Sequence, residues 1–99
     1  MEKGLISCIF YLHLTLTICT FSPISGPCCT FSCNTDGVGR REKYVTSSNT
    51  AQQCAAFVML YYPDATGATY GNGRCYAEIG QTDTTYSSWK ANCVLPGII

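Results

Sequence analysis

Apolar residues recur at helical spacing in the middle of the chain, from position 50 to position 61. A capping box can open this helix in two registers, Asn49 with Gln52 or Thr50 with Gln53. Pro63, two residues after this stretch, lacks a backbone N–H donor and ends the helix. One face of the predicted helix carries the small apolar residues Ala51, Cys54, Ala55 and Val58.

Downstream of the helix the pattern changes to that of strands joined by turns. The segments at 65–70 and 74–80 read as two strands of a hairpin, with Gly-Asn-Gly between them as the turn. A polar loop at 81–88 then leads to a last strand at 89–95. Alternation in this last strand places Trp89, Ala91, Cys93 and Leu95 on one face, so we expect Trp89 in the core.

Upstream of the helix the pattern is less regular. Residues 27–41 are rich in cysteine and turn-forming residues, and 42–46 is a possible short strand. The order strand, helix, hairpin, strand predicts an α+β fold. We expect a small disulfide-stapled domain in which one helix packs on a short antiparallel sheet.

The N-terminus has the features of a secretory signal peptide. Lys3 precedes an apolar stretch at 4–21, which a turn-like, small-residue region follows. Cleavage is expected between residues 19 and 26, after Cys19, Ser22 or Gly26. The alternative is an uncleaved membrane anchor, but the stretch is at the lower length limit for a spanning helix and contains threonines. We therefore expect residues 1–26 to be removed, with no stable membrane insertion afterwards.

Cysteine content gives the strongest indication of the protein's class. Six of the eight cysteines lie beyond the signal segment, at positions 28, 29, 33, 54, 75 and 93. An even number of cysteines behind an export signal indicates a secreted, extracellular domain held by disulfides. Residues 27–99 are enough for one such domain.

Charge and histidine content exclude several functional classes. Six basic and six acidic residues give zero net charge, so nucleic acid is not an expected partner. His13 falls in the signal segment, which leaves no Ser-His or Cys-His pair for catalysis, and an enzyme is not expected. Cys29 and Cys33 have zinc-ligand spacing but no second pair, so neither a metal nor another cofactor is expected.

Two exposed features remain as candidates for function. Alternation in the returning hairpin strand places Cys75, Ala77 and Ile79 inward, and their neighbours outward. We expect a ligand-binding surface made of Arg74, Tyr76 and Glu78, with Tyr70 and Tyr86 nearby, because exposed Tyr and Arg are favoured at interfaces. Separately, Arg40-Arg41 resembles a dibasic processing site, but we expect it to stay intact in a solvated loop.

The segment from Asn49 to Leu95 resembles the PAN/apple family of extracellular modules. The residues that carry the resemblance are NTAQQCAA, GATYGNGRCYAE and W-x-x-x-C-V-L. It implies a helix packed on a curved sheet, stapled by helix-to-strand disulfides.

The resemblance also implies a disulfide pattern. A second bridge of the family is absent, because its two positions hold Val58 and Ala65 here. The remaining helix-to-strand bridge is then Cys54 to Cys75. Cys93 is expected to pair with one of Cys28, Cys29 and Cys33, and the other two with each other. Which of the three pairs with Cys93 stays open, although adjacent cysteines rarely form a bridge.

The expected function is that of a secreted PAN/apple-like binding module that recognises an extracellular protein or glycan. A secreted effector peptide, toxin-like or antimicrobial, is the alternative. Its neutral charge counts against it, because membrane-active peptides usually present a cationic face. A structural role in a matrix or mucus is a third possibility.

Overall fold

The computed structural model describes residues 28–95, which form one helix and a three-stranded antiparallel sheet. The elements in chain order are β1 (Ser32–Ser47), α2 (Ala51–Tyr61), β2 (Gly67–Gly71) and β3 (Arg74–Val94). This arrangement agrees with the expected α+β class, although strands make up most of the described chain. The predicted signal peptide at 1–26 lies outside the described residues.

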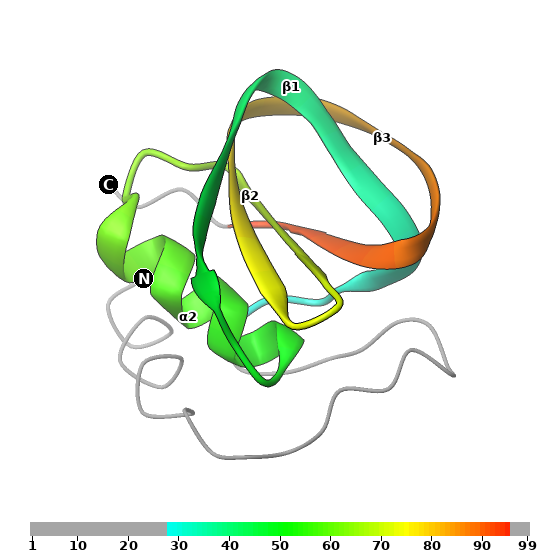
Figure 1. Cartoon of the computed structure of the whole chain (residues 1–99). Helices are drawn as coiled ribbons and strands as arrows, with labels where there is room; N and C mark the ends of the chain where they lie inside the picture. The colour runs from blue at the N-terminus through cyan, green and yellow to red at the C-terminus, as the bar shows by residue number, and fades with distance from the viewer. Residues whose placement is uncertain (1–27, 96–99) are drawn as a thin grey trace.

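The sheet is curled far enough to form a ring. β1 pairs with β3 along its whole length, from Ser32 opposite Asn92 to Ser47 opposite Arg74. β2 pairs with both ends of β3, so that Gly67 faces Glu78 on one side and Val94 on the other. Figure 1 shows β1 and β3 arching together, with β2 between the two ends of β3. The sheet therefore has an inner and an outer face.

The predicted helix and its cap are confirmed. Thr50 is the N-cap, and its hydroxyl accepts a hydrogen bond of 3.0 Å from the backbone N–H of Gln53. The Gln53 side chain in turn accepts from the backbone N–H of Asn49 at 2.7 Å, which completes a variant of the capping box. The helix ends at Tyr61, before Pro63.

The predicted hairpin is also confirmed. Asn72 and Gly73 have φ angles of 51° and 75°, which is the backbone of a two-residue type I′ turn. That turn twists in the same sense as the strands it joins, so β2 passes directly into β3. Asn and Gly are the residues that tolerate this backbone best.

The prediction was wrong about the two long strands. β1 covers most of the segment expected to be turns, and β3 runs through the expected loop at 81–88 without a break. Three irregularities shift the register between β1 and β3, between Cys33 and Thr35, Val38 and Gly39, and Tyr44 and Thr46. Each irregularity interrupts the two-residue period and bends the strand, so the alternation that marks a strand is lost.

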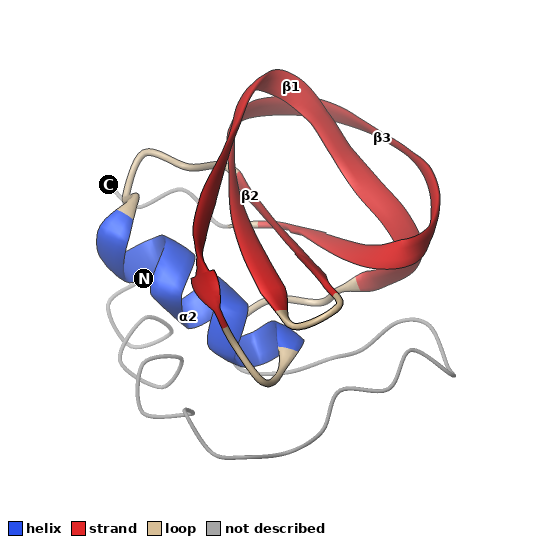
Figure 2. Ribbon diagram, in the orientation of Figure 1, coloured by secondary structure: helices blue, strands red, loops and turns tan. Residues whose placement is uncertain are grey.

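Helix α2 covers the outer face of the sheet near the ends of β2 and β3 (Figure 2). The small side chains predicted for one helix face, Ala51, Cys54, Ala55 and Val58, are all completely buried there. From the sheet, the core receives mainly Ala68, Cys75, Ala77, Ile79, Ala91 and Cys93, with Phe31 and Leu95 from the chain ends. Because most of these residues are small, the helix and the sheet pack with little apolar volume, and the disulfides carry more of the stability.

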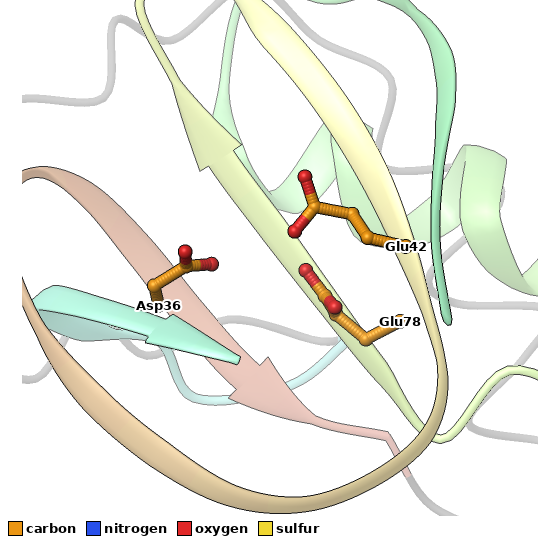
Figure 3. Close-up of side chains that lie close together, drawn as sticks. All are labelled: Asp36, Glu42 and Glu78. Atoms are coloured by element: carbon orange, nitrogen blue, oxygen red, sulfur yellow. The ribbon is translucent and has the colours of Figure 1, made fainter. Parts of the chain in front are cut away.

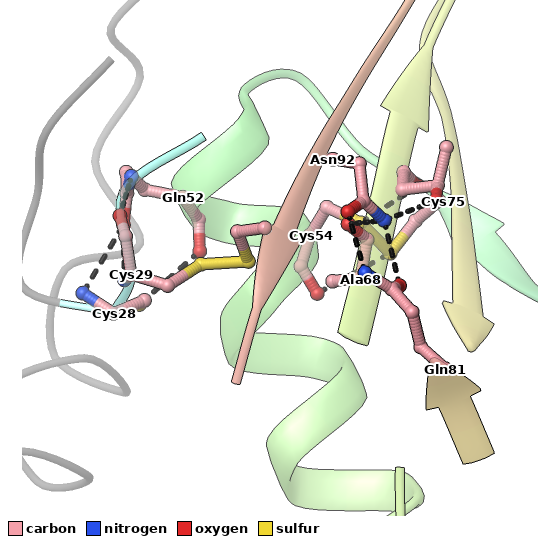
Figure 4. Close-up of a disulfide and its surroundings, with 10 residues drawn as sticks. Cys28, Cys29, Gln52, Cys54, Ala68, Cys75, Gln81 and Asn92 are labelled. Carbon is pink, nitrogen blue, oxygen red and sulfur yellow. Dashed lines mark hydrogen bonds between the residues drawn. A yellow bond between two sulfur atoms is a disulfide. The ribbon is translucent and has the colours of Figure 1, made fainter. Parts of the chain in front are cut away.

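Two disulfides join the helix and the chain ends to the sheet. Cys54 of α2 is bonded to Cys75 of β3, the pair that the resemblance implied (Figure 4). Cys93 of β3 is bonded to Cys29, which settles the choice that the sequence left open. Cys28 and Cys33 are disulfide-bonded as well, and their pairing with each other stays a prediction.

Candidate binding surface

The structure separates the five residues predicted to form one binding surface. Arg74, Tyr76 and Glu78 do lie on the sheet face opposite the helix, as alternation predicted, but the ring of strands makes this face the inner one. Arg74 is exposed and Tyr76 is half-buried, whereas only 2% of the Glu78 side chain is accessible. The expectation that Glu78 faces solvent was therefore wrong.

The two remaining tyrosines lie elsewhere. Tyr70 is opposite Cys75 and Ala91, and packs against the core from the outer face. Its hydroxyl donates to the backbone oxygen of Ser48 at 3.3 Å, and burial raises the pKa of this tyrosine. Tyr86 is 75% exposed on β3, opposite Thr35. Tyr70, Tyr86 and the buried Glu78 therefore lie in different environments, and the role of the five residues in binding stays a prediction.

The inner face is polar and its groups are connected by hydrogen bonds. Thr69 donates to Glu78 at 2.6 Å, and accepts from the Asn92 amide at 2.9 Å. The side-chain amides of Asn92 and Gln81 bond each other in both directions, at 2.8 and 2.9 Å (Figure 4). Glycines at 37 and 67 leave room for the Gln81 side chain, which a Cβ at either position would meet.

Three carboxyl groups meet beside this network. Asp36 and Glu42 come from β1 and Glu78 from β3, and one carboxyl oxygen of each lies within 4.8 Å of the other two (Figure 3). Lys90 forms an ion pair with Asp36 at 3.1 Å, with both side chains largely buried. Lys90 therefore compensates part of the negative charge that the two strands bring together.

Burial and neighbouring charges change the protonation of this cluster. Burial raises the pKa of Glu78 to about 8, and a hydrogen bond with Glu42 and the charges of Glu42 and Asp36 act in the same direction. At neutral pH Glu78 is thus mainly protonated and can donate to Glu42. Burial lowers the pKa of Lys90, but the hydrogen bond and charge of Asp36 outweigh this effect and raise it.

Carboxylate oxygens at this spacing have the chemistry to hold a hard cation. In this cluster, however, Lys90 already supplies a positive charge and Glu78 carries a proton at neutral pH. The arrangement therefore acts as a polar connection between β1 and β3.

Aromatic side chains surround Lys90. Its ammonium lies 5.5 Å from the centre of the Tyr76 ring and 4.7 Å from that of the Trp89 ring. Tyr76 also makes an edge contact with Tyr44, with ring centres 5.7 Å apart. Tyr76 therefore has a packing role in addition to its partial exposure.

The prediction that Trp89 belongs to the core was wrong. Trp89 has the same parity as Ala91 and Cys93, but it is 45% exposed, because the pairing of β3 with β1 skips from Tyr86 to Ala91 and the two-residue alternation does not continue through the residues between them. Its ring lies against Gly71 of β2, where a Cβ would fall 2.7 Å from the ring. Only glycine at position 71 permits this approach without displacing the ring.

A hollow of about 230 Å³ opens beside this ring, and we refer to it as the Trp89 pocket. Its lining residues are Asn34, Tyr70, Gly71, Asn72, Ser88, Trp89, Lys90 and Ala91. Of the five predicted binding residues, Tyr70 is the one found here. Sequence analysis missed Trp89, Asn34 and Asn72, although a tryptophan and a turn asparagine are both frequent in binding sites.

A second hollow, of about 510 Å³, lies beside the Cys29–Cys93 disulfide. It is lined largely by threonines and aliphatic residues, and it contains none of the exposed aromatic side chains. The Trp89 pocket is therefore the more distinctive of the two.

Comparison of the chain with protein-family models, with curated proteins and with solved structures gives no match. Within residues 28–95, no helix is long and apolar enough to cross a membrane.

Proposed function

We propose that this chain is a secreted binding module, similar to PAN/apple domains, that recognises a protein or a glycan outside the cell. The apolar N-terminus and the even number of later cysteines support export. All cysteines in the described part of the chain are in disulfides, which suits an oxidising compartment.

The observation that carries the proposal is the exposure of large aromatic side chains on the two long strands. Tyr44, Tyr86 and Trp89 are 54%, 75% and 45% exposed. A domain of this size has few apolar residues to spare from its core, so aromatic rings left on the surface suggest contact with a ligand. Tyrosine and tryptophan combine apolar area with a polar group, which favours them at binding interfaces.

The experiment is to express the full chain in a secreting eukaryotic host, and to measure the intact mass of the product with and without alkylation. We expect a product that lacks residues 1 to about 26 and has no free thiol. The purified product is then applied to glycan and protein arrays, with its reduced and alkylated form as the control.

Capture of a defined glycan or protein by the oxidised form alone is the expected result. A product that keeps Met1 and stays in the membrane would contradict export. A secreted product that binds nothing on either array, yet lyses cells or vesicles, would favour the toxin-like alternative.

A further inference from the structure

Trp89 presents a fixed aromatic surface at the edge of the core. Its ring is held against the backbone of Gly71, and Tyr70, which also lines the pocket, has its hydroxyl bonded to Ser48. Both rings are therefore positioned before any ligand arrives, which reduces the entropy lost on binding. About half of Trp89 remains accessible, enough for a flat apolar ligand face to contact it.

Polar side chains with unused hydrogen-bonding capacity surround this ring. Within residues 28–95, the side chains of Asn34, Asn72 and Ser88 make no hydrogen bond with protein atoms. Amides and hydroxyls both donate and accept, so these three side chains match a ligand that carries several hydroxyl groups.

The two asparagines are held in an uncommon backbone conformation. Asn34 and Asn72 have φ angles of 57° and 51°, in the left-handed region that glycine adopts most easily. Glycine would satisfy the backbone at both positions, but it would leave no amide in the pocket. Asn72 also suits the turn that it opens, and both asparagines place an amide in the lining of the pocket.

The charge and size of the pocket narrow the ligand class. Lys90 is its charged lining residue, and the Asp36 carboxylate 3.1 Å away offsets this charge. The volume of about 230 Å³ is below the roughly 300–1,000 Å³ of pockets for drug-sized ligands. A neutral ligand about as large as one six-membered ring would fit these limits.

We propose that the Trp89 pocket binds one ring of a neutral carbohydrate. The C–H groups of the sugar contact the exposed part of the indole, which Gly71 and the Lys90 ammonium leave free, and its hydroxyls bond Asn34, Asn72 and Ser88. The assignment rests on the proposed function as a binding module, for which it names one ligand class and one site.

The test uses the intrinsic fluorescence of Trp89, which is the only tryptophan in the chain. The secreted protein is titrated with methyl glycosides of glucose, galactose, mannose and N-acetylglucosamine. We expect a saturable change in emission with at least one of them, at millimolar concentration. The same titration with methyl glucuronide tests the preference for a neutral ring, and a tighter response to this acidic probe would contradict it.

Variants separate binding from folding. Asn34→Gly and Asn72→Gly keep the left-handed backbone available and remove one amide each, so each should weaken binding about tenfold. Tyr61→Ala removes an exposed aromatic residue of α2 outside the pocket and should leave the titration unchanged. Thermal unfolding of all three variants checks that the fold is intact.

The outcomes distinguish the site from the general function. If no glycoside changes the emission while the chain captures a ligand on an array, the pocket assignment is wrong and the binding module stands. If a captured protein is lost on Trp89→Phe without any sugar response, the pocket takes a peptide and the carbohydrate assignment is overturned. Empty arrays together with silent titrations would overturn both.

Discussion

Glu78 is the residue whose environment differs most from that expected of its type. It is a carboxyl group with 2% exposure, hydrogen-bonded to Thr69 and close to two other carboxyl groups. Protonation is the least costly way to bury it there, because a neutral carboxyl avoids both desolvation of a charge and repulsion from Asp36 and Glu42. The proton of Glu78 is thus part of the contact between β1 and β3.

This proton makes stability depend on pH. The ordinary pKa of the glutamate is 4.5, and the folded protein raises it to about 8. The folded state therefore binds the proton more tightly than the unfolded state. The stabilisation that this proton gives the folded state is fully present below about pH 4.5, and it is lost as the pH rises to about 8. Across this interval the free energy of unfolding should fall by up to about 1.4 kcal/mol per pH unit.

Glu78→Gln should remove this dependence. Glutamine can still accept from Thr69 and donate to Glu42, and it carries no proton to lose. Urea unfolding between pH 4.5 and 8.5 should show a nearly flat profile for this variant and a falling one for the original protein. Asp64→Asn, which changes an exposed carboxylate outside the cluster, should keep the falling profile. A flat profile in the original protein would show that Glu78 is ionised when folded.

At the scale of single elements, α2 anchors the N-terminal cysteine segment through Gln52. This glutamine is 4% exposed. Its side-chain oxygen accepts hydrogen bonds from the backbone N–H groups of Cys28 and Cys29, and its side-chain nitrogen donates one of 2.8 Å to the backbone oxygen of Cys29 (Figure 4). The segment has no strand partner at this point, so the glutamine replaces a neighbouring strand.

Gln52→Leu should be strongly destabilising, although the two side chains are similar in size. Leucine fits a buried position but leaves the backbone groups of Cys28 and Cys29 without their partner, at a cost of about 1–3 kcal/mol. Leu60→Ala on the exposed side of the same helix should change stability by less than about 0.5 kcal/mol. Chemical denaturation compares the two. Equal stability of both variants would show that water replaces the glutamine at no cost.

The two mapped disulfides should contribute unequally. Cys54–Cys75 spans 21 residues, and Cys29–Cys93 spans 64. In the loop-entropy model the shorter loop is worth about 3 kcal/mol and the longer about 4 kcal/mol. Replacing both cysteines of a pair with alanine should therefore cost more stability for the longer loop, as measured by thermal unfolding. The reverse order would indicate that the buried helix-to-strand bridge matters more for packing than for chain entropy.

The helix and hairpin could be predicted from sequence because their signals are local. The cap at Thr50, the helical spacing and the Asn-Gly turn each lie within a few residues. The first part of β1 and the middle of β3 could not, because the inner face of the ring is polar, and residues such as Gln81 make a strand look like a loop. Trp89 was assigned to the core on a strict two-residue period, but the register shift between Tyr86 and Ala91 interrupts that period in the folded strand.

At the scale of the whole molecule, the pairing of the strands in the ring determines which backbone groups a protease can reach. β1 and β3 protect each other's backbone over almost their full length, and β2 fills the gap between the ends of β3. Backbone groups held in this pairing are not free to bind a protease, although β1 pairs with β3 alone and its other side is a sheet edge. The exposed side chains of the ring therefore do not imply an accessible backbone.

Arg40 and Arg41 show the consequence. Both side chains are exposed, as a processing enzyme would require, but their backbone lies within β1, where Arg41 is opposite Ile79 and Gly39 opposite Gln81. A protease must draw its substrate into an extended, unpaired conformation, so cleavage here requires local opening of the ring. We expect the oxidised protein to resist trypsin at this pair and the secreted product to contain it intact.

Reduction of the disulfides should expose the Arg40-Arg41 pair, because the ring then loses its covalent ties to the helix and to the segment at Cys29. Mass spectrometry of limited digests, before and after reduction, measures both states. Rapid cleavage after Arg40 or Arg41 in the oxidised form would show that the middle of β1 separates readily from β3, and would favour a processed peptide over an intact module.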